Sequence, residues 1–100
     1  MSVIMMLRAK GDPARLETWA NDNAERLTRI ADDGRDAGCL HHMFAASNDE
    51  IVIIDEWPNE AAFKQFFASQ QDIPNVMNAA GVTGEPHFTY LRKLSMPDEF

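Results

Sequence analysis

The spacing of apolar and polar positions changes along the chain and predicts alternating strands and helices. Residues 3–7 form an unbroken apolar run, which is typical of a strand buried on both faces. Asp12 and Pro13 follow after a glycine, and this order of N-cap and proline predicts the start of a helix. Apolar side chains then recur at helical spacing, so we expect one helix of about five turns over residues 13–32, ended by Gly34.

The middle of the chain predicts a β-hairpin. Residues 39–46 alternate with a period of two, residues 51–57 begin as a continuous apolar run, and residues 47–50 between them have the composition of a turn. One face of the first of these strands is expected to carry Leu40, His42, Phe44 and Ala46.

A helix capped by Asn59, a short helix opened by Asp72 and a strand over residues 85–94 complete the predicted elements. The order strand, helix, strand, strand, helix, strand is that of a ferredoxin-like α+β domain, βαββαβ, with a four-stranded antiparallel sheet. We expect a single domain over residues 1–100. Because the helices cover one face of the sheet, the apolar residues on the other face predict a homodimer that packs sheet against sheet.

Composition and charge narrow the function classes. The 100 residues suffice for one domain, and 45% hydrophobic with 25% charged residues is typical of a folded globular protein. Nine basic and sixteen acidic residues give a net charge of −7, which disfavours nucleic acid and anionic membrane surfaces as partners. The single cysteine argues against a disulfide framework and fits a reducing cytoplasm. We expect neither a membrane span nor a signal peptide, because the first apolar stretch stops at Arg8.

Three short segments carry a resemblance to a known family. They are Gly38 to Leu40, the pair Glu56 and Trp57, and the run Asn59 to Phe63. With the order of elements, over about residues 3–94, they resemble the dimeric α/β-barrel superfamily and within it the antibiotic-biosynthesis-monooxygenase-like (ABM) domains. That resemblance implies a pocket between the sheet and the helices. Members of this superfamily differ in what they do: some oxidise phenolic polycyclic substrates by dioxygen without metal or flavin, some degrade haem, some isomerise lactones, and some have roles that are still unassigned.

The haem-degrading branch of the family departs from this sequence at three positions. That branch relies on an Asn on the first strand, a Trp on the second helix and a His just beyond it. Here the first strand holds no Asn, Phe66 stands where the Trp is expected, and residues 73–81 hold no His. The resemblance therefore argues against haem degradation.

Four side chains are candidates for catalysis: His42, His87, Tyr90 and Arg92. His41 and His42 are adjacent on a strand and point to opposite faces, so at most one of them lines the pocket. With His87 they show no spacing typical of a metal site, and we expect no metal. A histidine in the pocket suits proton transfer from a phenol, although each histidine also has a structural interpretation. For Arg92 the alternative is a salt bridge at the sheet edge with an acid of the third strand.

Aromatic side chains are candidates for the walls of a substrate pocket, with ordinary core packing as the alternative. They are Trp19, Trp57, Phe63, Phe66 and Phe67. The acidic run over residues 49–60 is interpreted as a solvated edge, and its neighbours Asp55 and Glu56 face opposite ways. Cys39 is interpreted as a small buried residue. No glycine-rich phosphate loop is present, so no nucleotide cofactor is expected.

The resemblance implies a cofactor-independent monooxygenase, an oxidoreductase acting on a small aromatic, phenolic or quinone-like substrate in an apolar pocket. The residues are compatible with this activity but do not indicate it by themselves. Two alternatives stay open: a non-catalytic dimer that binds a small apolar ligand in a stress or regulatory role, and a His-assisted isomerase or lyase on the same fold.

Overall fold

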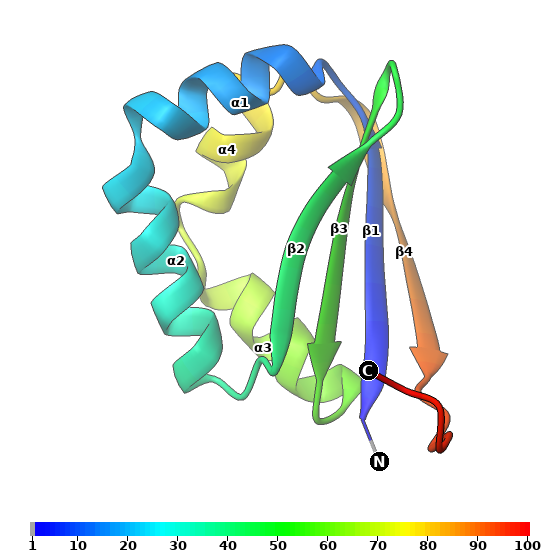
Figure 1. The fold of residues 1–100 in the computed structure, drawn as a ribbon. Coiled ribbons are helices and arrows are strands. Elements are labelled where there is room, and N and C mark those ends of the chain that lie inside the picture. Colours follow the sequence, from blue (N-terminus) through cyan, green and yellow to red (C-terminus); the bar gives the residue numbers. More distant parts are fainter. Residues whose placement is uncertain (1) are drawn as a thin grey trace.

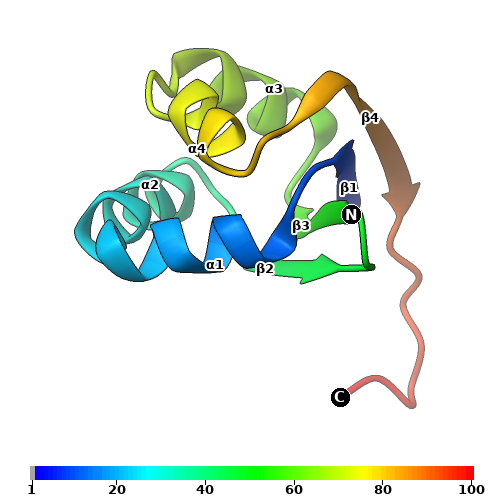
Figure 2. The ribbon, with the colours of Figure 1, turned by 90° about the horizontal axis from the view of Figure 1, so that it is seen from above.

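A computed structural model describes residues 2–100 and contains four strands and four helices (Figure 1). In chain order they are β1 (Val3–Lys10), α1 (Pro13–Asp22), α2 (Ala24–Asp36), β2 (His41–Ala46), β3 (Glu50–Trp57), α3 (Glu60–Ser69), α4 (Ile73–Ala79) and β4 (Thr83–Arg92). The strands form one antiparallel sheet in the order β2-β3-β1-β4, so the first and third strands lie in the middle. All the helices lie on one face of this sheet (Figures 1 and 2). The predicted ferredoxin-like fold is confirmed.

The core lies between the sheet and the helices. Met5, Leu7 and Ala9 of β1 alternate toward the helices and are buried together with Trp57 of β3 and Phe63 of α3. The intervening residues of β1 face the opposite, uncovered side of the sheet. The expectation that β1 is buried on both faces is therefore only half met within one chain, because its outer aliphatic side chains remain partly exposed.

Side-chain caps fix the starts of two helices where the sequence predicts them. The Asp12 carboxylate accepts hydrogen bonds from the backbone N–H groups of Ala14 and Arg15, at 3.0 and 3.3 Å. Asn59 Oδ1 accepts one from the N–H of Ala62 at 2.8 Å. Both bonds satisfy amide groups that a helix leaves without an internal partner in its first turn.

The predicted single helix over residues 13–32 is wrong. The chain leaves the helical conformation at Asn23, with φ −126° and ψ 34°, and its amide side chain donates to the Trp19 carbonyl at 2.9 Å. Such local bonds from Asn compete with helix continuation. The break gives α2 a new direction, which Figure 1 shows, and α2 then continues past the expected end at Gly34.

Two glycines at the end of α2 have different surroundings. Gly34 is buried inside the helix and packs next to α3, and a Cβ built on it would lie 3.4 Å from the Phe66 ring, an ordinary van der Waals contact. Gly38 has a φ of +112°, which an L side chain rarely adopts, and there the chain turns toward β2.

The sheet face opposite the helices is uncovered and carries aliphatic side chains. Met43 and Leu91 are 54% and 48% exposed on this face. Met43 is paired with Ile54 of β3, and Leu91 is paired with Ile4 of β1. Both isoleucines are partly exposed. The C-terminal tail extends beyond β4 and away from the helices (Figure 2). Within residues 2–100 no helix combines the length and the apolar character that crossing a membrane requires.

Candidate functional site

A cavity of about 320 Å³ lies between the sheet and the helices. Aliphatic side chains of α2 and α4 form its helical side: Leu27, Ile30, Ala31, Ile73, Val76 and Met77. Aromatic side chains from the strands and α3 form much of the rest: Phe44, Trp57, Phe63, Phe66 and Phe67. Four polar side chains reach it, namely Thr28, Cys39, His42 and Asp55. Among the described residues that line the cavity there is no Lys or Arg, so its interior favours an uncharged, apolar ligand.

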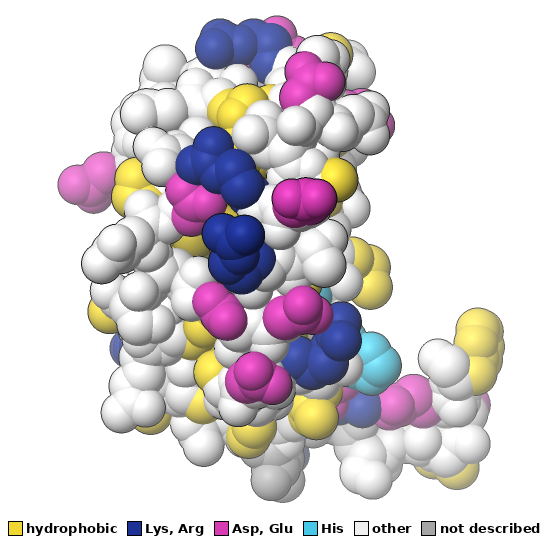
Figure 3. All heavy atoms as spheres, turned by 90° about the vertical axis from the view of Figure 1, so that its left-hand side faces the viewer, with side chains coloured by type: hydrophobic (Ala, Val, Ile, Leu, Met, Phe, Trp, Pro, Cys, Tyr) yellow, Lys and Arg dark blue, Asp and Glu magenta, His cyan; other side chains and the backbone are white. Residues whose placement is uncertain are grey.

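Charged side chains are instead spread over the outside of the helices. Figure 3 shows this side of the molecule, where basic and acidic side chains alternate and hydrophobic side chains appear between them. The net charge of −7 therefore describes the surface more than the cavity.

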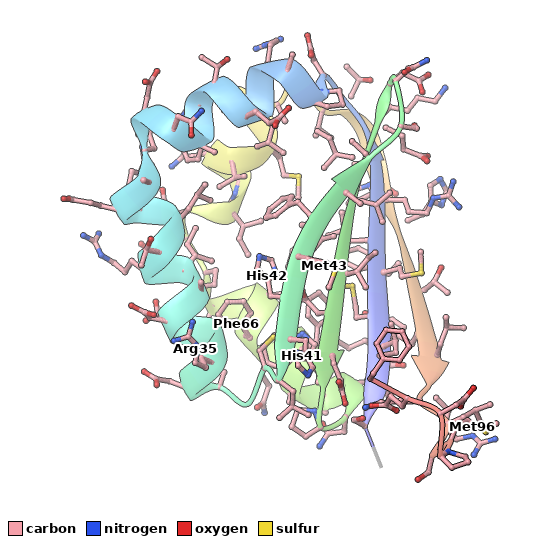
Figure 4. All side chains as sticks on the ribbon, in the orientation of Figure 1. Arg35, His41, His42, Met43, Phe66 and Met96 are labelled. Atoms are coloured by element: carbon pink, nitrogen blue, oxygen red, sulfur yellow. The ribbon has the colours of Figure 1, made fainter. Side chains whose placement is uncertain are left out.

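His42 and Asp55 form the polar centre of the cavity wall. They are directly opposite each other on the paired strands β2 and β3, and His42 Nδ1 lies 2.6 Å from Asp55 Oδ1. The Asp55 side chain is only 7% exposed, whereas that of His42 is 39% exposed. Figure 4 shows His42 pointing from β2 toward the helices. The acid is thus buried behind a histidine that also reaches the solvent.

The second oxygen of Asp55 is also occupied. Trp57 lies two residues further along β3, on the same face, and its indole N–H donates to Asp55 Oδ2 at 3.0 Å. A carboxylate only accepts hydrogen bonds, so this network assigns a proton to His42 Nδ1. The Nε2 atom of the neutral imidazole is then left as an acceptor. A histidine held in this way can take a proton from a ligand.

Aromatic rings hold the other sides of the site. The ring of Phe44 meets that of His42 edge to face, with centroids 5.2 Å apart, and Phe44 is 41% exposed at the cavity edge. Trp57 lies between Phe63 and Phe66, at centroid distances of 5.8 and 5.3 Å. A planar aromatic ligand would meet ring faces and edges on more than one side.

Cys39 also lines the cavity but is a poor nucleophile. Burial raises the pKa of its thiol to about 11, and the nearby Asp55 carboxylate adds to that effect. Its S–H group lies 3.2 Å from the backbone carbonyl of His41, as a hydrogen-bond donor. The thiol therefore stays protonated at neutral pH, and only the thiolate attacks readily.

The structure brings five of the predicted site residues to the cavity and places four elsewhere. His42, Trp57, Phe63, Phe66 and Phe67 line it. His87, Tyr90, Arg92 and Trp19 do not.

His87 lies on the uncovered face of the sheet, because it is opposite Arg8, whose neighbour Leu7 faces the helices. Arg92 lies at the end of β4, opposite Val3.

Tyr90 and Trp19 pack at the edges of the core. The Tyr90 ring lies 6.1 Å from Phe63 under the ammonium of Lys64, and burial raises the pKa of its phenol. Trp19 packs against a second cluster of buried residues around Leu16, and the guanidinium of Arg26 covers its ring at 5.3 Å. Both aromatic side chains have packing roles.

Asp55 lines the cavity and is the candidate site residue that the sequence interpretation missed. The acidic run over residues 49–60 is not the expected solvated edge throughout, because Asp55 and Glu56 are only 6% and 8% exposed. A signal was present in the hairpin. A turn over residues 47–50 pairs position 46 with 51 and therefore places His42 opposite Asp55.

Glu56, on the other face, belongs to a separate polar group. Its Oε2 atom accepts from Ser2 Oγ at 2.6 Å and from Lys93 Nζ at 3.3 Å, and these bonds lower the pKa of its carboxyl. Across residues 2–100, no three His, Cys, Asp or Glu side chains are grouped so that they would hold a metal ion.

Comparison with known proteins defines the fold. The sequence matches no protein-family model and no curated protein. Among solved structures it is similar to SnoaB, a cofactor-independent oxygenase from Streptomyces nogalater, with 17% identity, a TM-score of 0.63 and 98% of each chain covered. A dimeric ferredoxin-like protein from an uncultured marine organism has a TM-score of 0.69 at 11% identity, covering 99% of this chain and 93% of that one. An antibiotic biosynthesis monooxygenase has a TM-score of 0.62 at 11% identity, covering 93% and 99%.

The protein therefore has the ABM-like form of the ferredoxin fold, as its resemblance to that family implies. At these identities the likeness establishes the fold alone. The activity has to be argued from the cavity and its residues.

Proposed function

We propose that the protein is a cofactor-independent monooxygenase that oxidises a small, uncharged phenolic substrate. The observation that carries this proposal is the His42–Asp55 hydrogen bond of 2.6 Å at the wall of an aromatic-lined cavity. The printed description of SnoaB as a cofactor-independent oxygenase supports the reaction class, on the same fold.

The chemistry requires one proton acceptor in an apolar space. His42 Nε2 takes the proton of a substrate hydroxyl, and the resulting imidazolium donates from Nδ1 to Asp55 Oδ1. The substrate anion transfers an electron to dioxygen, and the two radicals join at the reacting ring carbon to form a peroxide anion. This anion takes the proton back from the His42 imidazolium and becomes a hydroperoxide. Loss of water from this peroxide leaves a carbonyl group.

The atoms and electrons of this reaction balance without another reductant. An anthrone-type CH₂ group, whose enol tautomer carries the hydroxyl that His42 deprotonates, loses two hydrogens and gains one oxygen atom, becoming C=O. The second oxygen atom of O₂ leaves with those two hydrogens as water. The substrate supplies every electron, so the protein has only to bind, deprotonate and shield it.

The size of the cavity limits the substrate. A volume of about 320 Å³ is near the lower end of ligand pockets, which span roughly 300–1,000 Å³. We therefore propose a substrate of two or three fused rings. A carboxylate or phosphate on the buried part of the substrate is disfavoured, because Asp55 lines the cavity and no Lys or Arg does so among the described residues.

Oxygen uptake tests the proposal. The probe is dithranol, 1,8-dihydroxy-9-anthrone, supplied to the wild-type protein, to His42→Gln and to His41→Gln as the matched control. His41 is the adjacent histidine on the opposite face of β2. We expect His42→Gln to lower the rate about 100-fold or more, as removal of a general base does, and His41→Gln to retain it.

Two results would overturn the proposal. One is equal oxygen uptake by the wild-type protein and His42→Gln. The other is a rise in thermal stability with dithranol and no uptake above the protein-free rate, which would identify a small-ligand-binding protein instead.

We further propose that two copies pack through the uncovered faces of their sheets. Met43 and Leu91 expose apolar surface there, and a described structural neighbour is a dimeric ferredoxin-like protein. Burial of such a patch is the main source of stability in most protein interfaces. The solution mass should be twice the chain mass of 11.3 kDa, and Leu91→Glu should shift it toward the monomer. A monomer at micromolar concentration in the wild-type protein would refute the arrangement.

The cytoplasmic location expected from the cysteine content belongs to the same proposal. Cys39 is the single cysteine, and its half-buried thiol has no partner for a disulfide within the chain. Fractionation of cells that express the protein tests it, and recovery in the cytoplasmic fraction is the expected result.

A further inference from the structure

Trp57 does more in the structure than form a wall. Its side chain is 1% exposed, lies against the cavity and donates its indole N–H to Asp55 Oδ2 at 3.0 Å. Asp55 in turn meets His42 through its other oxygen. The three side chains thus form one chain of hydrogen bonds from the core to the cavity edge.

We infer that Trp57 is a positioning residue: its indole N–H fixes the Asp55 carboxylate so that His42 keeps its proton on Nδ1 and presents Nε2 to the cavity. The geometric part of this inference stands on the hydrogen bonds alone. Its consequence for turnover rests on the proposed function.

A carboxylate needs such an anchor because its terminal torsion is soft. The χ2 angle of Asp has broad, two-fold preferences, so a carboxylate held through one oxygen can still rotate. The indole is rigid and is fixed by its ring neighbours, with centroids 5.8 Å from Phe63 and 5.3 Å from Phe66. A donor on such a ring fixes the plane of the acceptor.

His42 depends on this anchor because of where it lies. It belongs to β2, the outer strand next to β3, and its side chain is 39% exposed. It makes an edge-to-face contact with the ring of Phe44 and a hydrogen bond with the carboxylate of Asp55. Of these two, only the carboxylate selects which ring nitrogen carries the proton.

The tautomer of His42 tests the inference without any substrate. Long-range ¹H–¹⁵N spectra of the neutral imidazole separate a protonated from a bare ring nitrogen, and the His42→Gln variant assigns the signals. We expect the Nδ1–H form to dominate in the wild-type protein and to lose population in Trp57→Phe, which keeps an aromatic ring and removes the donor. Trp19→Phe is the matched control, because Trp19 lies outside the cavity lining.

An unchanged tautomer ratio in a folded Trp57→Phe protein would overturn the inference. If that variant does not fold, the wild-type indole signals decide. The chain has two tryptophans, and Trp19→Phe identifies the Trp57 signal. That N–H proton should resonate downfield, exchange slowly with solvent and move upfield in Asp55→Asn. If the chemical shift of the Trp57 N–H proton is unchanged in Asp55→Asn, the hydrogen bond and the positioning role based on it are refuted.

Turnover gives the second readout. With dithranol as substrate we expect Trp57→Phe to lower kcat about tenfold or more, the size of effect expected from one bond to a charged group, and to change KM less than twofold. A loss confined to KM would show that Trp57 acts only as a wall and would overturn the positioning role. If the wild-type protein consumes no oxygen, the proposed function fails, while the tautomer experiment still decides the role of Trp57.

Discussion

Replacing Asp55 with Asn is the most informative single change to the site. The variant keeps the size and shape of the side chain but replaces one of two acceptor oxygens by an NH₂ donor. Two donors meet this carboxylate in the structure, from His42 at 2.6 Å and from Trp57 at 3.0 Å. An amide accepts with only one atom, so one donor has to give way.

The expected cost follows from this conflict. Asp55 is 6% exposed, so water does not readily replace the lost acceptor. Leaving one buried donor unpaired costs about 1–3 kcal/mol of unfolding free energy. His42 escapes this cost by moving its proton to Nε2 and accepting from the amide, and it then loses the acceptor that faces the cavity. We therefore expect a stability loss near the lower end of that range and a loss of oxygen uptake of about 100-fold or more.

Urea unfolding followed by circular dichroism gives the first quantity, and an oxygen electrode with dithranol gives the second. Asp49→Asn, in the exposed turn between β2 and β3, is the control and should change stability by less than about 0.5 kcal/mol. The reasoning is refuted if Asp55→Asn matches this control in stability, or if it retains the wild-type rate of uptake.

Three further predictions concern other parts of the molecule. Burial raises the pKa of the Cys39 thiol to about 11, so Cys39 should react with iodoacetamide at pH 7.5 far more slowly in the folded than in the urea-unfolded protein. Mass spectrometry measures the extent of alkylation, and equal rates in the two states would contradict the burial argument. Arg26 holds the pKa of Asp72 at about 2, below its unfolded value, so this pair stabilises the fold above about pH 4 and the stabilisation is lost as the pH falls toward 2. In Asp72→Asn the urea midpoint should change less with pH over that range than it does in the wild-type protein. An unchanged dependence of the midpoint on pH would refute the pairing. Phe63→Ala should lower the unfolding free energy by about 3–5 kcal/mol, because the ring is 3% exposed; a loss below about 1 kcal/mol would show that this part of the core is loosely packed.

The sheet and its topology were predictable because their signals are local. The apolar runs of residues 3–7 and 51–54 mark the two central strands, and the turn at 47–50 sets the register of the hairpin. Caps at Asp12 and Asn59 follow from residue type and position alone.

The break at Asn23 and the cavity were harder to predict from the sequence. Helical periodicity continues across Asn23, so the apolar pattern marks no break there, and the weaker stop signal is the residue type, since Asn favours helix ends. Arg26, three residues beyond the break, donates from Nε to Asp72 at 3.0 Å, 46 residues away in the sequence. That long-range contact joins α2 to the start of α4 and depends on the completed fold.

The site was only partly predictable, because its residues meet through the completed fold. Strand alternation says that at most one of His41 and His42 lines the cavity, and the structure shows that it is His42. Helical spacing indicates the aromatic walls on α3. His87 and Tyr90 carry the right chemistry, but alternation alone does not say which face of β4 meets the helices or where the cavity ends. Asp55 was missed because it belongs to an acidic run, and runs of charged residues are usually exposed. In this run, however, Asp55 and Glu56 are both buried.

The proposed function depends on the transfer of a proton from a phenolic ligand in the cavity to His42 Nε2. A crystal structure of the protein with dithranol, grown without oxygen so that the ligand stays intact, tests this transfer. We expect a ligand hydroxyl oxygen about 2.6–3.2 Å from His42 Nε2, with the His42–Asp55 bond retained and the ring system against Trp57. A ligand bound in the cavity with no hydroxyl within reach of Nε2, or bound only outside the cavity, would contradict it.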